Sequence, residues 1–324
     1  MKRFDFTDIA RGLAILYIIQ CHVCDYHIAW IDSWAMPVFF VIMGIFFKPT
    51  STWREMIVKK AKTILLPFLL LSIPSFIQYA IQLSFTDFLK RIVDPFNCMH
   101  GVGWFLVCMF WCYLIYYAIH RVVKGKMYMK LILSLLVSIL FYYLSTWRPE
   151  ILGGHRLVFP LFISTSFTCM SLIAIGELLR DYLLRNAALS CNMLIISVLL
   201  GGGIILLFGC KGGAMIVNDY YGQPYILWIV NSILGSMAIL EISKYLPSFM
   251  SFFGRHSLLM LMVHPYVKRI LLIQLEPSII TYVAIVIITT ILVYALAKYL
   301  PITEGKIKFK SNGINKKRYK IPTP

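Results

Sequence analysis

Two ionisable residues, Arg11 and His22, lie in one strongly apolar run near the start of the chain. At 100° per residue, their spacing is about 20° beyond three whole helical turns. Both side chains would therefore point the same way from a helix, with Ile15 and Ile18 on the strip between them. A guanidinium can hold an anion and an imidazole can take a proton, so this face of the helix could support chemistry.

A carboxylate stands one turn beyond each of these residues. Asp8 can pair with Arg11, and Asp25 can orient the imidazole of His22. The alternative is structural: Arg11 would extend to the membrane interface and His22 would be an ordinary interfacial residue. An unpaired charge at the centre of a bilayer costs about 2.5–3.5 kcal/mol. The pair on one face, with its carboxylates, therefore favours a functional site.

The composition indicates a membrane protein. The 324 residues are 60% hydrophobic and 14% charged, with a mean hydropathy of +0.78. Soluble domains are nearer 45–50% apolar and about 25% charged. The net charge of +17 arises from short basic clusters between apolar runs, which is the pattern that orients membrane proteins and not that of nucleic-acid binding.

Runs long enough to cross about 30 Å of hydrocarbon as helix are regularly spaced along the chain. We expect about ten spans, near residues 7–25, 33–47, 63–83, 101–120, 128–146, 157–179, 188–209, 225–243, 256–275 and 278–298. The fold class predicted is thus all-α, a polytopic transmembrane helical bundle. The lipid bilayer is its first partner.

The distribution of charge predicts the orientation. Most of the 31 Lys and Arg residues fall on one side of the membrane if the N-terminus is cytoplasmic, which indicates an N-in, C-in topology. The first span is not expected to be a cleaved signal, because Asp8 and Arg11 interrupt its apolar region. We expect one transmembrane domain over residues 1–300. Residues 301–324 would form a basic cytoplasmic tail against anionic lipid.

The motif "CHVC", which contains Cys21 and Cys24, raises the question of a metal or redox site. A zinc site needs a second pair of ligands at suitable spacing, and Cys108 and Cys112 lie in another apolar span. Haem attachment needs the histidine after the second cysteine, not inside the pair. We interpret these cysteines as apolar filler and predict no metal.

The opening "FDFTDIARGLAILYIIQCH" resembles the integral-membrane acyltransferase family three, which is marked by an arginine, ten intervening residues and a histidine in the first span. "WAMPVFFVIMGIFFK" is similar to the second span of the branch that resembles fucose 4-O-acetylases. "KKAKTILLPFLL", "GVGWFLVCMF" and "FFGRHSLLMLMVHPYV" resemble three later segments of the family. Lys60 and Lys62 stand where many relatives carry Arg-x-Arg.

The resemblance implies a membrane O-acyltransferase that moves an acetyl group from cytoplasmic acetyl-coenzyme A to a sugar hydroxyl. The acceptor would be a surface or exported polysaccharide or a lipid-linked glycan. Arg11, held by Asp8, would engage the donor together with Lys60 and Lys62. His22 would act as general base or carry the acetyl group itself, and the residues leave both routes open.

The donor is a substrate, and no permanently bound cofactor is expected. The membrane would be the inner, cytoplasmic membrane of a bacterium.

The acceptor side is predicted from three further residues. His264 precedes Pro265 in a late span, His155 lies in an outer loop, and Trp104 could stack on a sugar ring. Each also has a structural interpretation: a kinked-helix residue bonded to a carbonyl, a solvated loop residue and a membrane anchor. All three are predicted to bind the acceptor.

The sequence is also compatible with two other classes of function. A flippase or transporter of a lipid-linked glycan would also be polytopic, although it should show paired broken helices in repeated halves, which the sequence lacks. A structural or sensory membrane protein would not need Arg11 and His22 on one face. Transfer of label from acetyl-coenzyme A to a glycan would distinguish these classes.

Overall fold

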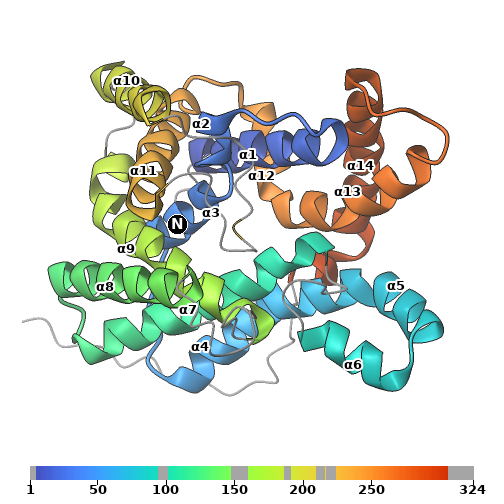
Figure 1. The fold of residues 1–324 in the computed structure, drawn as a ribbon, viewed down its shortest axis with the longest axis horizontal. Coiled ribbons are helices and arrows are strands. Elements are labelled where there is room, and N and C mark those ends of the chain that lie inside the picture. Colours follow the sequence, from blue (N-terminus) through green and yellow to red (C-terminus); the bar gives the residue numbers. More distant parts are fainter. Residues whose placement is uncertain are drawn as a thin grey trace, which may run out of the picture.

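The computed structural model describes residues 5–93, 101–146, 160–185, 191–208, 216 and 224–305. These residues form helices and connecting turns and contain no strand, which confirms the all-α prediction (Figure 1). The helices are α1 (Asp5–Cys24), α2 (Ala29–Asp32), α3 (Pro37–Ile45), α4 (Trp53–Lys60), α5 (Leu66–Gln82), α6 (Phe85–Val93), α7 (Trp104–Val122), α8 (Met127–Thr146), α9 (Ile163–Arg185), α10 (Cys191–Leu207), α11 (Tyr225–Ile242), α12 (Ser251–Arg255), α13 (Ser257–Leu271) and α14 (Ile279–Tyr299).

Six helices among the described residues are long and apolar enough to cross a membrane: Asp5–Cys24, Trp53–Gln82, Gly101–Val122, Met127–Leu144, Tyr225–Ile242 and Ile279–Tyr299. The second of these joins α4 to α5 through the π-helical segment Ala61–Leu65. The chain is thus a multi-pass membrane protein. The count of about ten spans and the N-in, C-in orientation stay predictions, and the tail from residue 306 lies outside the described residues.

The predicted second span, residues 33–47, forms the nine-residue helix α3 instead of a full-length span. Nine residues extend about 14 Å along a helix, less than half of the hydrocarbon thickness. Every residue of α3 is buried in the protein. Every face of α3 is therefore apolar because every face packs against protein, and not because the helix spans the membrane.

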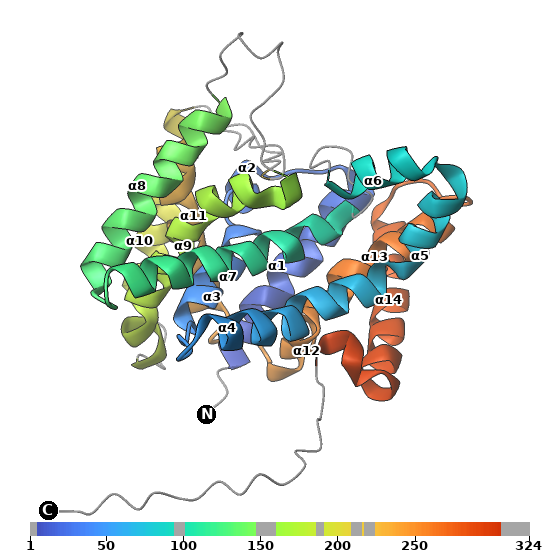
Figure 2. The same cartoon turned by 90° about the horizontal axis from the view of Figure 1, so that it is seen from below.

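Helix α1 lies beside α12 and between α11 and α14 (Figures 1 and 2). It contacts α12, α13 and α14 as well as α3 and α11, so the N-terminal helix meets the C-terminal third of the chain. Ala10, Ala14, Ile15 and Ile19 of α1 are almost completely buried in these contacts. Arg11 is half-buried and His22 is exposed, so both side chains of this contact region remain accessible.

Glycine permits a very close crossing of α3 and α9. A Cβ added at Gly44 would lie 2.0 Å from the carbonyl oxygen of Ile173, and one at Gly176 would lie 2.0 Å from that of Val41. Both clashes are with backbone atoms, which cannot move aside as the end of a side chain can. The two helices can therefore pack at this distance only with glycine at both positions.

The C-terminal end of α3 is held by Arg180 of α9. Its guanidinium donates hydrogen bonds to the carbonyl oxygens of Gly44, Ile45 and Phe47, at 3.2, 2.6 and 2.6 Å. The last carbonyls of a helix lack partners within that helix and carry partial negative charge. Arg180 satisfies them inside the protein and fixes α3 against α9.

We predict that Gly44→Ala destabilises the protein by at least 1–3 kcal/mol, the typical cost of overpacking, because the new methyl group meets backbone. The control is Gly202→Ala in α10, where nothing lies within 4 Å of the added Cβ. That variant should keep or slightly raise the melting temperature, since alanine favours helix over glycine by about 0.5–1 kcal/mol. Thermal unfolding in detergent measures both. Equal melting temperatures for the two variants would contradict the close crossing.

Candidate active site

Arg11 is held on α1 by its neighbour Asp8. The two side chains form an ion pair, and the Asp8 side chain is buried whereas that of Arg11 is 30% exposed. The backbone of α1 packs directly on α12 here, since a Cβ at Gly254 would come within 1.6 Å of the Asp8 carbonyl oxygen. The predicted Asp8–Arg11 pair is thus confirmed, and it lies where the backbones of α1 and α12 are in close contact.

Arg11 lines a cavity of about 260 Å³, which we call the Arg11 cavity. The second basic group on its wall is Lys60, whose Nζ lies 3.1 Å from the centre of the Tyr113 ring. Most of the other lining side chains are apolar: Ile15, Ile18, Met36, Phe39, Ile42, Met43, Phe46, Ile64, Phe105, Leu106, Met109, Leu258 and Leu261. Lys62 is exposed and is not part of this wall. The cavity thus has a cationic side and an apolar interior.

His22 lines a second cavity of about 470 Å³, which we call the His22 cavity. Its polar lining residues are Tyr17, Cys21, His22, Asp25, His27, Asp32 and Trp104, from α1, the following loop, α2 and α7. Trp104 is half-buried there, as expected of a residue that could stack on a sugar ring. A larger share of its lining residues is polar than in the Arg11 cavity, and the predicted general base is one of them.

Ile18, Met36 and Leu261 line both cavities. The two cavities therefore adjoin at these three apolar side chains, which we call the partition. Ile18 belongs to the strip that the helical spacing placed between Arg11 and His22. At 1.5 Å per residue the two residues are about 16 Å apart along α1. The cation and the imidazole thus face two neighbouring cavities on one side of the same helix.

The ring of His22 is hydrogen-bonded to His264 of α13. The His22 Nδ1 and His264 Nε2 atoms are 2.9 Å apart, and the rings are nearly parallel, with centroids 5.1 Å apart. His264 is 1% exposed and its Nδ1 lies 3.1 Å from the carbonyl oxygen of Met260. His264 is not among the residues that line the His22 cavity, and its predicted role in binding the acceptor stays a prediction.

These contacts determine where the protons lie on neutral rings. A carbonyl oxygen only accepts, so His264 must donate from Nδ1 to Met260 and leave Nε2 as an acceptor. His22 must then donate from Nδ1, and its own Nε2 is unprotonated. An imidazole in this tautomer can take a proton at Nε2, as a general base does. We therefore predict that His264 positions His22, the role expected of Asp25.

Asp25 itself lies away from the His22 ring. The helix ends at Cys24, and Asp25 has a φ of 50°, which turns its fully exposed side chain toward His27, with a separation of 3.6 Å. The expected pairing of Asp25 with His22 assumed that the helix continued for another turn. His155 lies outside the described residues, so its predicted role stays a prediction.

His27 and Asp32 are polar residues of the His22 cavity that the sequence analysis missed. The hydroxyl of Tyr17 donates to Asp32 Oδ1 at 2.7 Å, and His27 Nδ1 lies 3.2 Å from the same oxygen. The available signal was a cysteine, a histidine and an aspartate within twelve residues. It becomes meaningful only once the chain is known to reverse after α1.

A comparison with protein families decides the class of this protein. Residues 4–298 match the model of acyltransferase family 3, which is described as an acyltransferase domain. The chain belongs to this family. The match extends from the start of α1 almost to the end of α14, so it covers every helix that lines the two cavities. Neither the curated proteins nor the solved structures gave a match.

We predict that His264→Ala lowers kcat for acyl transfer about 10–10²-fold and leaves KM for the donor unchanged, because His264 positions His22 and does not line the Arg11 cavity. The expected loss does not exceed the 10²–10⁴-fold that a general base contributes, because the base itself is still present in the variant. His264→Gln keeps a hydrogen-bond acceptor and should recover part of the rate. His120→Ala, on α7 away from both cavities, is the control. A wild-type kcat in His264→Ala would exclude the positioning role.

Proposed function

We propose that this acyltransferase moves an acetyl group from acetyl-coenzyme A, bound on the Arg11 side, to a sugar hydroxyl on the His22 side. The observation that supports this most directly is the pair of cavities on one face of α1, one lined by the basic side chains of Arg11 and Lys60 and the other by the imidazole of His22. The family match supports a transferase over the flippase or transporter considered from the sequence.

The Arg11 cavity suits the arm of a thioester donor. Ligand pockets commonly have volumes of about 300–1,000 Å³, so a cavity of about 260 Å³ would take the acyl group and part of the pantetheine arm and leave the nucleotide outside. Arg11 and Lys60 offer positive charge to the anionic part of the donor. Lys62, exposed two residues after Lys60, can act at the mouth but not inside. The apolar wall would hold the acyl chain.

The reaction follows from the tautomer of His22. The acceptor hydroxyl passes its proton to His22 Nε2, its oxygen bonds to the acetyl carbon, the carbon–sulfur bond breaks, and the leaving sulfur takes the proton from His22. Alternatively, Nε2 attacks the thioester carbon and the carbon–sulfur bond breaks to release the coenzyme A thiolate; the hydroxyl oxygen then takes the acetyl group from Nε2, which breaks the carbon–nitrogen bond, and the hydroxyl proton passes to the thiolate. Both routes need the same unprotonated nitrogen. Both also need the partition of Ile18, Met36 and Leu261 to let the acetyl group reach His22.

The His22 cavity suits a sugar acceptor. Its volume of about 470 Å³ is within the range of small-molecule pockets, and Trp104 offers an aromatic face for a sugar ring. Carboxylate and hydroxyl groups of Asp32 and Tyr17 can bond to sugar hydroxyls. We propose a surface or exported polysaccharide, or a lipid-linked glycan, as the acceptor, and the inner membrane of a bacterium as the location.

Membranes that contain the protein should transfer label from acetyl-coenzyme A to a surface glycan, and His22→Ala should lower this rate at least 10²-fold while the protein still inserts and accumulates. Gln20→Ala, two residues earlier on α1 and outside both cavities, should keep the wild-type rate. Label counts in the purified glycan measure the transfer. More than about a tenth of wild-type activity in His22→Ala would remove His22 from either catalytic role.

A further inference from the structure

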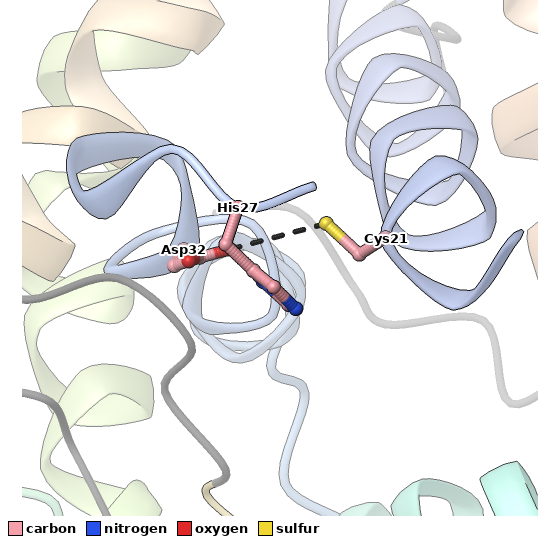
Figure 3. Close-up of side chains that lie close together, drawn as sticks. All are labelled: Cys21, His27 and Asp32. Atoms are coloured by element: carbon pink, nitrogen blue, oxygen red, sulfur yellow. Dashed lines mark hydrogen bonds and ion pairs between the residues drawn. The ribbon is translucent and has the colours of Figure 1, made fainter. Parts of the chain in front are cut away.

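Three possible metal ligands converge on the wall of the His22 cavity. Cys21 projects from the last turn of α1 toward His27 and Asp32, which come from the loop after α1 and from α2 (Figure 3). One ligand atom from each residue lies within 4.8 Å of the others. They are a thiol, an imidazole and a carboxylate, which are the three donor types that proteins use to bind zinc.

The distances between these atoms are close to those of an occupied zinc site. Tetrahedral zinc with ordinary bond lengths places a ligating nitrogen and oxygen about 3.4 Å apart, and a sulfur and oxygen about 3.6 Å apart. Here His27 Nδ1 lies 3.2 Å and Cys21 Sγ lies 4.0 Å from Asp32 Oδ1. All three ligand atoms lie within 4.8 Å of one another, so shifts of up to about an ångström would place them at three corners of the tetrahedron.

The surrounding groups are those that support metal ligands. A metal-bound histidine usually directs its second ring nitrogen to a carboxylate or carbonyl. His27 Nε2 faces Asp25 at 3.6 Å, within ion-pair range, and this leaves Nδ1 for a metal. The hydroxyl of Tyr17 donates to Asp32 at 2.7 Å and fixes that carboxylate, whose side chain is only 7% exposed.

The backbone brings the three ligands together in a specific way. Asp25 adopts a left-handed conformation with a φ of 50°, and its N–H bonds to the Cys21 carbonyl oxygen at 3.1 Å, which ends α1. Asparagine and aspartate adopt this conformation more readily than other residues with a Cβ. The chain then reverses, so His27 and Asp32 return to the side of α1 that carries Cys21.

We propose that Cys21, His27 and Asp32 bind a zinc ion. Binding would replace the thiol proton of Cys21 by the metal and release that proton to solvent. Three protein ligands leave the fourth position of a tetrahedral ion open, as in catalytic zinc sites. Since all three residues line the His22 cavity, that position would take a water molecule or an acceptor hydroxyl. This inference does not depend on the identity of the acyl donor.

Cobalt is the probe, because thiolate-bound Co²⁺ absorbs through a sulfur-to-metal charge-transfer band. The full-length protein in detergent, first stripped with a chelator, should bind one tightly held Co²⁺ with this band, and added Zn²⁺ should displace it. Cys21→Ser should abolish the band. The matched control is Cys24→Ser, since Cys24 Sγ lies 3.6 Å from the Ser278 carbonyl oxygen and outside the cluster.

Two further variants separate metal binding from folding. His27→Gln changes a loop side chain that is 37% exposed, so the fold should persist while Zn²⁺ affinity falls at least tenfold. Tyr17→Phe removes the hydroxyl that donates to Asp32 and accepts the Ile28 N–H at 2.8 Å, and it should weaken Zn²⁺ binding about 10–100-fold, the usual effect of losing a supporting group. Both are measured by competition with a zinc indicator. An equal band in Cys21→Ser and Cys24→Ser, or no band in the wild type, would overturn the proposal and leave a hydrogen-bonded network only.

Discussion

The polar side chains of α1 that line the two cavities bond to partners within the protein, and these bonds determine the arrangement around the helix. Arg11 pairs with Asp8, His22 bonds to His264, and Tyr17 bonds to Asp32. An unpaired buried charge or polar group would cost several kcal/mol. The same contacts hold the guanidinium against one cavity and the imidazole against the other, so stability and the proposed chemistry depend on one set of bonds.

The rest of the bundle provides a rigid frame for these contacts. The glycine crossing of α3 and α9, with Arg180 on the last carbonyls of α3, fixes the helix that carries the partition residue Met36 at its start. Two ion pairs have little exposed surface. Lys130 of α8 pairs with Glu177 of α9 at 2.7 Å and so links two helices, and Lys244 pairs with Glu241 at 2.8 Å at the end of α11. Removing one partner of such a pair leaves a buried charge, which is strongly destabilising.

The sequence predicted what depends on local periodicity. The common face of Arg11 and His22 and the Asp8–Arg11 pair follow from the angle of 100° per residue. Contacts between distant segments were not predictable in this way: His264 is 242 residues from His22, and only the packing of α13 on α1 brings them together. Asp25 was misplaced because the helix ends just before it. Hydropathy alone also could not show that residues 37–45 are a core helix surrounded by protein.

The most direct test of the account is the sidedness of the reaction. The proposed path crosses part of the membrane, because the donor binds at the Arg11 cavity and the acceptor at the His22 cavity about 16 Å further along α1. Right-side-out vesicles loaded with labelled acetyl-coenzyme A should acetylate a glycan added outside, and external donor with internal glycan should give no product. Product from donor and glycan supplied only on the same side, or only in the reversed arrangement, would contradict the account.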